Sequence, residues 1–347
     1  MYKEILEQSE VLERTISGRL DTNSDDIPIK SDRASKFEKI WIVACGTAYH
    51  AGLFGKDLFE KVLGVPVSVE LASEFRYREP IVGKNDLGIV ISQSGETMDT
   101  IAATELLKEN GSHVLALVNV VGSSLARMAD SVFYLHVGPE IGVASTKAYL
   151  GMLVSQLVLA KHWDSKNRLD VSFDEIAELP NLIDKTMACE DQIKEISEKI
   201  YKKNDIYFIG RGLDYALAAE GALKLKEISY LHAEALAAGE LKHGTLALIE
   251  EGTPVVVTAS QNHLLDKTTS NVQEVIARGA YVIAIGDSES EKLENISNDY
   301  VTLPDSNEIL TTVISIIPLQ FIAYHVANKN GQSIDQPRNL AKSVTVE

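Results

Sequence analysis

Three hydroxyl side chains, an amide and a glycine follow a short apolar run in the stretch LGIVISQSGETMDTI. These residues are Ser92, Gln93, Ser94, Gly95 and Thr97. A strand that runs into a helix N-terminus exposes unpaired backbone N–H groups and a partial positive charge, which suits a phosphate dianion. A helix cap requires only one such side chain, so simple capping and an anion site both stay open. No Gly-Lys-Ser/Thr follows, and the stretch is therefore not a nucleotide P-loop that implies Mg²⁺.

A second group of charged side chains has helical spacing. Glu220, Lys224 and Glu227 lie at i, i+4 and i+7 in EGALKLKEISYLHAEA, which we interpret as one helix over residues 220–235. On an exposed face such pairs are ordinary salt bridges, each worth roughly 0.2–0.5 kcal/mol. In a site, a carboxylate of this group could instead act as a proton-transfer base, which contributes roughly 10²- to 10⁴-fold in rate. The spacing by itself favours the exposed salt-bridge interpretation.

Two further residues have suitable chemistry in unremarkable settings. His243 stands in ELKHGTLALI, between a predicted helix and a strand-like run, where a histidine is commonly just solvated. An imidazole nevertheless changes charge near neutral pH, which suits acid–base chemistry. Lys342 stands in the terminal NLAKSVTVE, and terminal tails usually fray. This tail has no charge run and little turn chemistry beyond Pro337, so an ordered tail folded over a site is a reasonable expectation.

An alternation of short apolar runs and helical patterns must position these residues. We predict strands at 40–44, 67–71, 87–92, 114–119 and 131–137, and helices from about 47, at 97–109 and at 146–163. Such alternation indicates parallel strands joined by crossover helices. Ligands of a doubly wound sheet bind beyond the carboxyl ends of its strands, and residues 92–97 fall at such an end.

The second half of the chain repeats the order of the first. DIYFIGRG at 205–212 matches IWIVACGT, and the stretch that begins TPVVVTASQ matches the one that begins NDLGIVISQ. In both halves these two strands are separated by roughly 47 residues. We therefore predict an α/β fold of two tandem doubly wound parallel-sheet sandwiches related by internal duplication. The predicted parts are an N-terminal helical segment and linker (1–35), a first subdomain (36–175), a helical connector (176–200), a second subdomain (201–338) and a C-terminal tail over the site (339–347).

Composition narrows the class of protein. The chain has 347 residues, a net charge of −17 and a pI near 5.0, which favours about two domains and disfavours nucleic acid and anionic membranes as partners. We find no apolar run that approaches the roughly 18 residues of a membrane span, and no signal peptide at the start. Cys45 and Cys189 form no disulfide framework or metal motif. We expect a cytoplasmic, reduced protein without a metal or cofactor.

Several longer motifs carry a family resemblance. They are CGTAYHAG, ELASEFRYREP, ISQSGETMDT, GPEIGVASTKAY, EGALKLKEISYLHAEALAAGELKHG and the terminal DQPRNLAKSVTVE. Together they resemble the isomerase half of the glutamine–fructose-6-phosphate aminotransferase family, whose sugar-isomerase (SIS) fold is a duplicated sandwich. The resemblance covers nearly the whole chain, and the terminal motif is its most specific part.

The resemblance implies an activity and its catalytic residues. Fructose 6-phosphate and ammonia would give glucosamine 6-phosphate, and without ammonia fructose 6-phosphate and glucose 6-phosphate would interconvert. Glu227 matches the proton-transfer base and Lys224 its neighbouring active-site lysine. His243 matches a ring-opening histidine that relatives contribute across a homodimer interface. Lys342 matches the lysine that forms a Schiff base with the open-chain ketose before ammonia displaces it.

The resemblance also implies a set of sugar-phosphate contacts. They are Cys45, Gly46, Thr47, Ser92, Gln93, Ser94, Thr97, Val143, Ser145, Arg338 and Ala341. Ala48 departs from the serine of many relatives, which puts one hydroxyl contact, worth about 1 kcal/mol, in doubt. Thr245 replaces a proline common in relatives, and we expect that change to be neutral.

Family members carry a glutaminase domain whose N-terminal cysteine attacks glutamine, whereas Tyr2 follows Met1 in this sequence. Ammonia would then come from a glutaminase domain outside this chain, and both an excised domain and a natural stand-alone protein stay open. One alternative is a stand-alone fructosamine or amino-sugar 6-phosphate deaminase or deglycase, which the intact terminal motif disfavours. Another is a non-catalytic sugar-phosphate sensor, which two sandwiches, the acidic balance and the lack of a helix-turn-helix signal disfavour.

Overall fold

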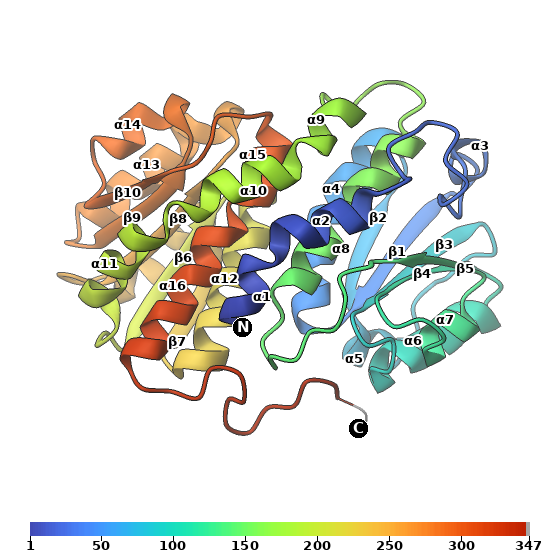
Figure 1. The fold of residues 1–347 in the computed structure, drawn as a ribbon, viewed down its shortest axis with the longest axis horizontal. Coiled ribbons are helices and arrows are strands. Elements are labelled where there is room, and N and C mark those ends of the chain that lie inside the picture. Colours follow the sequence, from blue (N-terminus) through green and yellow to red (C-terminus); the bar gives the residue numbers. More distant parts are fainter. Residues whose placement is uncertain (345–347) are drawn as a thin grey trace. The chain divides into compact units, whose positions relative to one another are not determined.

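Two five-stranded sheets of parallel strands organise the chain, of which the computed structural model describes residues 1–344 (Figure 1). Read in the same sense, their strand orders are β2-β1-β3-β4-β5 and β7-β6-β8-β9-β10. The second order repeats the first, so the predicted α/β duplication is confirmed. The strands are β1 Lys39–Ala44, β2 Val67–Leu71, β3 Asp86–Ser92, β4 His113–Val118, β5 Ser131–Tyr134, β6 Asp205–Gly210, β7 His232–Ala237, β8 Pro254–Ala259, β9 Tyr281–Gly286 and β10 Asp299–Thr302.

Each sheet belongs to its own compact unit. Unit A contains Glu10–Glu140, Lys147–Glu178 and residues 341–344 of the tail. Unit B contains Met1–Ser9, Ile141–Thr146 and Leu179–Leu340. The subdomain limits inferred from the sequence remain predictions.

Helices cover both faces of the unit A sheet because side chains of successive strand residues point to opposite faces. Trp41 and Val43 of β1 pack in one apolar cluster with Phe75 of α5 (Ala72–Phe75) and Leu107 of α6 (Met98–Glu109). The intervening Ile42 faces α4 (Gly46–Leu63), which lies against α8 (Lys147–Trp163). The close approach depends on glycine, since a Cβ on Gly52 would lie 2.8 Å from Ile42.

Unit B repeats this layering. Tyr207 and Ile209 of β6 pack with Val272 of α13 (Leu265–Ile276) on one face of the sheet. Phe208 points to the other face, where it meets Gly221 of α12 (Leu213–Ser229), which in turn packs on α16 (Ile316–Lys329).

The remaining helices are α1 Tyr2–Leu6, α2 Gln8–Ile16, α3 Ser31–Ala34, α7 Ser124–Met128, α9 Phe173–Ala177, α10 Leu179–Met187, α11 Glu190–Ile200, α14 Glu291–Glu294 and α15 Glu308–Ile314, with 3-10 turns η1 Ala238–His243, η2 Thr245–Leu248, η3 Asn262–Leu264 and η4 Ser288–Ser290.

Three local predictions were wrong. The helix expected over 220–235 ends at Ser229, because Tyr230 adopts a left-handed conformation with φ +63° and the chain then forms edge strand β7 beside β6. The strand expected over 131–137 ends at Tyr134, and His136 also has positive φ, +56°. The strand-like run after His243 is the 3-10 helix Thr245–Leu248.

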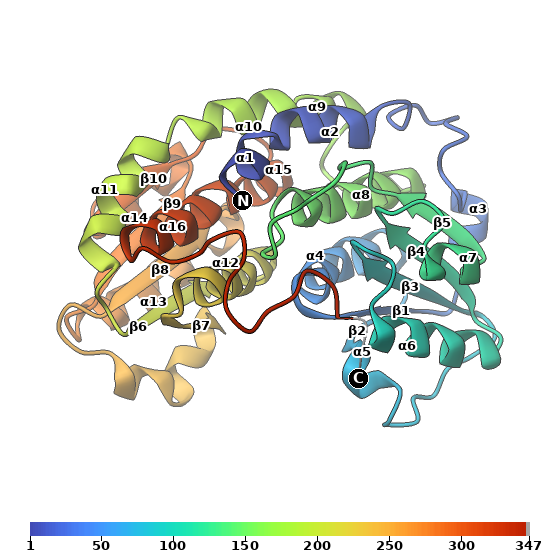
Figure 2. The ribbon, with the colours of Figure 1, turned by 60° about the horizontal axis from the view of Figure 1, so that its bottom comes forward.

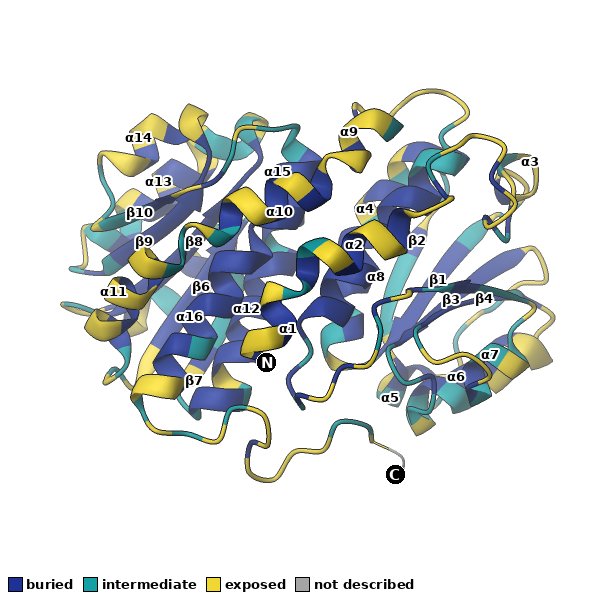
Figure 3. Cartoon of the chain, viewed as in Figure 1, coloured by how far each residue is buried: buried dark blue, intermediate teal, exposed yellow. Residues whose placement is uncertain are grey.

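One segment is long and apolar enough to cross a membrane by length and composition, contrary to our expectation that no such run exists. It is Glu308–Lys329, with a mean hydropathy of 1.7. In the structure 94% of the qualifying window is buried within the protein, and Figure 3 shows α16 almost entirely in the buried colour. Core helices share this composition with membrane spans, because burial on all sides selects apolar residues all round.

Candidate active site

The carboxyl end of the unit A sheet brings two predicted loops together. β1 and β3 pair directly, with Val43 opposite Val90, and the chain leaves them for opposite edges of the sheet. This strand order has its topological switch point between β1 and β3, where such folds bind ligands. Cys45–Thr47 follow β1, and residues 92–97 begin at the last residue of β3, so both predicted sets flank that point.

Residues 92–97, which we call the anion loop, are held by their own hydroxyls. Ser92 Oγ accepts a hydrogen bond from Gly95 N at 3.1 Å and contacts Thr97 Oγ1 at 3.1 Å. Ser94 Oγ accepts from Glu96 N at 3.2 Å. Thr97 is the N-cap residue of α6 but makes no side-chain cap hydrogen bond to it. The hydroxyls therefore shape the loop rather than cap the helix, which favours the anion-site interpretation over the capping one.

The C-terminal tail contacts this loop within unit A (Figure 2). The hydroxyls of Ser343 and Ser94 are hydrogen-bonded at 3.1 Å, and the Val344 carbonyl accepts from Met98 N in the first turn of α6 at 3.3 Å. Lys342 Nζ forms an ion pair with Glu140 Oε2 at 2.5 Å. Residues 342–344 are thus attached to unit A, and Lys342 is not a solvent-exposed terminal lysine.

Gly95 is required by the shape of the anion loop, because its φ is +67° and its neighbours leave no room for a side chain. An added Cβ would lie 2.1 Å from Ser123 Oγ and 2.6 Å from Ser123 Cβ. We expect Gly95→Ala to lower the free energy of unfolding by about 2–4 kcal/mol, from backbone strain plus overpacking. Urea unfolding of purified protein measures this.

Gly122→Ala is the matched control for Gly95→Ala. Gly122 also has a positive φ, +72°, but nothing lies within 4 Å of an added Cβ. It should therefore show only the strain cost, of about 1 kcal/mol. Equal losses in the two variants would contradict the steric argument for Gly95.

In unit B the three charged residues of α12 form a buried cluster. Lys224 Nζ lies 3.3 Å from Glu220 Oε1 and 2.6 Å from Glu227 Oε2. The side chains of Glu220 and Lys224 are 0% and 1% exposed, and that of Glu227 is 20% exposed. Burial alone lowers the pKa of Lys224, but the two carboxylates outweigh it and raise its pKa, which keeps the ammonium charged. The exposed salt-bridge interpretation of this face is therefore wrong.

The same unit holds three further predicted sugar contacts, Val143, Ser145 and Arg338, whereas Ala341 belongs to unit A. Val143 N donates to the Asp335 carbonyl at 3.1 Å. Arg338 N donates to the Tyr230 hydroxyl at 2.8 Å, and its guanidinium lies 4.3 Å from the centre of that ring. Tyr230 ends the helix of Glu227. Ser145 lies half-buried in the 141–146 segment, close in sequence to Val143.

His243 stands apart from the other predicted residues. It ends the 3-10 helix Ala238–His243 and is exposed. Within residues 1–344 its side chain forms no hydrogen bond or ion pair.

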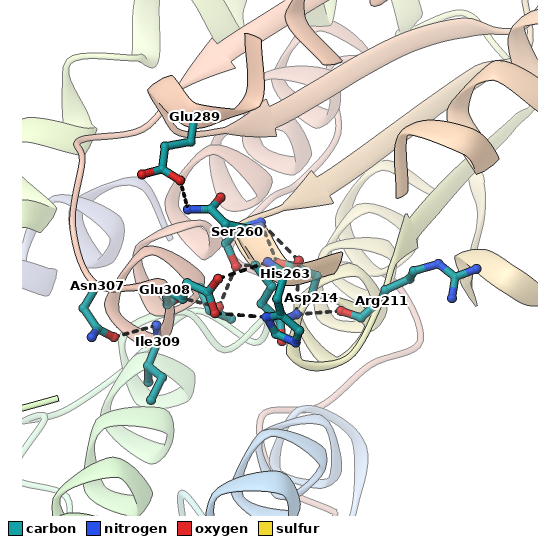
Figure 4. Close-up of polar contacts among 11 residues, drawn as sticks. Arg211, Asp214, Ser260, His263, Glu289, Asn307, Glu308 and Ile309 are labelled. Carbon is teal, nitrogen blue, oxygen red and sulfur yellow. Dashed lines mark hydrogen bonds and ion pairs between the residues drawn. The ribbon is translucent and has the colours of Figure 1, made fainter. Parts of the chain in front are cut away.

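The equivalent loop of unit B is closed by a carboxylate of the protein itself (Figure 4). Ser260-Gln261 follow β8, and in the matching sequence of unit A Ser92 ends β3 and Gln93 follows it. Asp214, in the first turn of α12 and 1% exposed, accepts from Ser260 N at 3.1 and 3.2 Å and from Ser260 Oγ at 2.6 Å. The first turn of α4 has no acidic residue. The two repeats therefore differ: the donors of the unit B loop bind an internal carboxylate.

Asp214 also predicts a pH dependence of stability. Burial raises its pKa from 3.8 to about 6, against the opposing effect of the Ser260 and Gln261 hydrogen bonds. The folded protein binds this proton more tightly than the unfolded chain, so the stabilisation is complete below pH 4 and is lost as pH rises through 6. We expect the difference in unfolding free energy between the parent and Asp214→Asn to fall by about 2–3 kcal/mol from pH 4 to pH 7. A difference that stays constant over urea titrations at these pH values would refute the raised pKa.

Two residues at these sites were not identified from the sequence. Glu140 gave no signal, because a lone glutamate after Gly-Pro has no periodic pattern. Asp214 has the ordinary appearance of an acidic residue in a first helical turn, which the helix dipole favours anyway. In residues 1–344 no group of three or more His, Cys, Asp or Glu side chains is arranged to hold a metal ion.

Comparison with known proteins agrees with this fold. Residues 35–161 and 199–328 match the SIS domain, one match in each half. The chain belongs to the SIS-domain family, which confirms the resemblance inferred from its motifs.

The individual relatives that match the chain carry the same family name as the resemblance inferred from the motifs. Over its whole length the chain is 48% identical to glutamine–fructose-6-phosphate aminotransferase (isomerizing) of Clostridium tetani and 47% identical to that of Pyrococcus horikoshii. It spans 59% and 58% of the lengths of those two proteins. Among solved structures, the C-terminal domain of glucosamine-fructose-6-phosphate aminotransferase from Francisella tularensis matches with a TM-score of 0.91 and 41% identity, over 96% of this chain and 97% of that one.

Proposed function

We propose that this chain is a sugar-phosphate isomerase module that converts fructose 6-phosphate and ammonia to glucosamine 6-phosphate. Without ammonia it interconverts fructose 6-phosphate and glucose 6-phosphate. The names of relatives that match the whole chain at 47–48% identity support this activity.

The observation that carries the proposal is an amine held beside the anion loop of unit A. Ser343 and Val344, which follow Lys342, are bonded to that loop and to the first turn of the helix behind it. In the proposed reaction the donors of residues 92–97 and 45–47 bind the phosphate and the sugar. The Lys342 amine attacks the C2 ketone of the open-chain sugar, and ammonia then displaces it.

The buried cluster of unit B supports a proton-transfer role for Glu227. The Glu227 side chain keeps 20% exposure, while Lys224 between the two glutamates offsets the repulsion of a second negative charge nearby. Glu227 would move the proton between C1 and C2, and Lys224 would keep it oriented. We propose Val143, Ser145, Arg338 and the Ala341 backbone as further sugar contacts.

Partners and compartment belong to the same proposal. His243 is exposed at the end of a 3-10 turn, which suits a residue that completes a site in a second copy of the chain. We therefore propose a homodimer in which His243 opens the sugar ring. Ammonia would come from a glutaminase domain outside these residues, since the relatives are longer than this chain. We place the protein in the cytoplasm, where its two free cysteines stay reduced.

A three-arm coupled assay on the purified protein tests the proposal. Fructose 6-phosphate is incubated alone, with ammonium chloride, or with glutamine. We expect glucose 6-phosphate without ammonia, glucosamine 6-phosphate with ammonium and no amino sugar with glutamine. If a protein shown to be dimeric forms no product in any of the three arms, the proposal is overturned.

A deaminase of amino-sugar phosphates is the alternative. The glucosamine-6-phosphate deaminase of Thermotoga maritima has a TM-score of 0.78 but only 22% identity, which shows a shared fold and nothing more. Ammonia release from glucosamine 6-phosphate and a panel of fructosamine phosphates, measured beside the three arms above, separates the two functions.

A further inference from the structure

The carboxylate of Glu140 is the fixed point of the C-terminal tail. Its side chain is 0% exposed, and it belongs to the scaffold of unit A rather than to the tail. Glu140 Oε1 accepts from Ala148 N in the first turn of α8 at 3.2 Å. That helix is buried along nearly its whole length, and its N-terminus favours a negative charge. The carboxylate is therefore held in place by unit A independently of the last residues of the tail.

The tail, in contrast, has no helix or strand of its own between residues 331 and 344. Three contacts attach its last described residues to unit A: the ion pair of Lys342 with Glu140 and the two neutral hydrogen bonds of Ser343 and Val344. Lys342 is 25% exposed, so its ammonium is partly shielded from water. Charge-assisted hydrogen bonds are roughly twice as strong as neutral ones, which makes the Glu140 contact the dominant one for the lysine side chain.

We infer that Glu140 is a positioning residue that holds the Lys342 amine at the anion loop in the orientation from which it reacts with a phosphorylated ketose. The inference rests on the proposed function, because it assigns Lys342 the Schiff-base role. In this role Glu140 acts through its ion pair with Lys342.

The pair also accounts for the proton balance of the step. In the resting pair Lys342 is an ammonium and Glu140 a carboxylate. One proton passes from Nζ to the Glu140 carboxylate, and the neutral amine attacks C2 to form the nitrogen–carbon bond. The two hydrogens that remain on the nitrogen then pass to the ketone oxygen, which leaves as water, and a carbon–nitrogen double bond remains. No oxidant, reductant or further reactant is needed.

Two chemical readouts at Lys342 test the inference, both quantified by peptide mass spectrometry on the full chain. The first is borohydride trapping of the Schiff base with fructose 6-phosphate. The second is reductive methylation by formaldehyde, which requires no sugar. For Glu140→Gln, which keeps the shape but removes the charge, we expect at least tenfold slower trapping and at least threefold faster methylation. Loss of the Glu140 contact should slow trapping and speed methylation at Lys342. A general destabilisation of the fold would instead speed methylation at other lysines as well.

Two further variants control for the loss of a buried carboxylate in general and for the loss of the charge at position 140. Asp86→Asn removes another buried carboxylate of unit A, one bonded to Trp41 Nε1 at the amino end of β3, and should leave both readouts unchanged. Glu140→Asp restores the charge and should recover trapping to within about threefold of the parent. If Glu140→Gln folds poorly, Glu140→Asp still decides, because trapping lower than one tenth of the parent would overturn the inference.

The design separates failure of the inference from failure of the proposed function. Parent-like values of both readouts in Glu140→Gln would overturn the positioning role. If the parent protein traps no sugar on Lys342, the proposed function fails. The methylation readout then still shows whether Glu140 holds the lysine.

Discussion

Glu227→Gln is expected to abolish most of the isomerase activity, lowering kcat by roughly 10²- to 10⁴-fold. The amide has the shape of the carboxylate but cannot accept the C1 proton. Lys224 keeps one ionised partner, Glu220, so its charge stays compensated in the variant. The loss should therefore lie in the chemical step, with fructose 6-phosphate binding changed by less than about threefold. Glucose 6-phosphate formation and calorimetric titration with fructose 6-phosphate measure the two quantities.

A second readout identifies the step that fails. Schiff-base trapping on Lys342 precedes proton transfer in the proposed sequence, so Glu227→Gln should retain it. Glu198→Gln, on the exposed face of α11 in the same unit, is the control and should leave the rate unchanged. Full activity in Glu227→Gln would exclude this carboxylate as the base.

Lys224→Met is expected to lower the free energy of unfolding by about 3–5 kcal/mol, the cost of breaking a buried ion pair from one side. The fully buried Glu220 would lose its cation and lie about two turns from Glu227 on the same helix face, without the ammonium between them. Urea unfolding, followed by far-UV circular dichroism, measures the loss.

Two variants test the electrostatic origin of that loss. Lys226→Met lies on the same helix but on its exposed face, and should cost less than about 0.5 kcal/mol. Adding Glu220→Gln to Lys224→Met removes the stranded charge, and should restore at least half of the lost stability. An unimproved double variant would show that the loss comes from packing and not from charge.

The order of elements and the location of the anion loop follow from local information. Alternating β-rich and helical runs predict parallel strands, and the polar run after β3 must then lie at the carboxyl end of a sheet. The repeat of that order in the second half predicted the duplicated sheets. These features depend on residues within a few turns of one another, which is why periodicity reveals them.

The ends of helices and the burial of side chains were harder to predict from the sequence. The helix of Glu227 stops at Ser229 because Tyr230 adopts a left-handed conformation that the sequence does not signal. Edge strand β7 then follows because β6 offers it a hydrogen-bonding partner. The charged face of α12 had the spacing of a solvent-exposed ladder, yet Glu220 and Lys224 are buried, since the packing of α12 in unit B decides which face is covered.

The sequence alone determined the class of fold, the family resemblance and the candidate residues, because these depend on local pattern and motif. Tertiary structure alone decided which charges meet. Glu140 and Lys342 are 202 residues apart, and Asp214 closes a loop 46 residues away. Pairing over such distances depends on how strands and helices pack in three dimensions. Burial changes the energetics of these charged side chains. Removal from water strengthens the interaction of a charge with its partner and makes an unpaired charge costly.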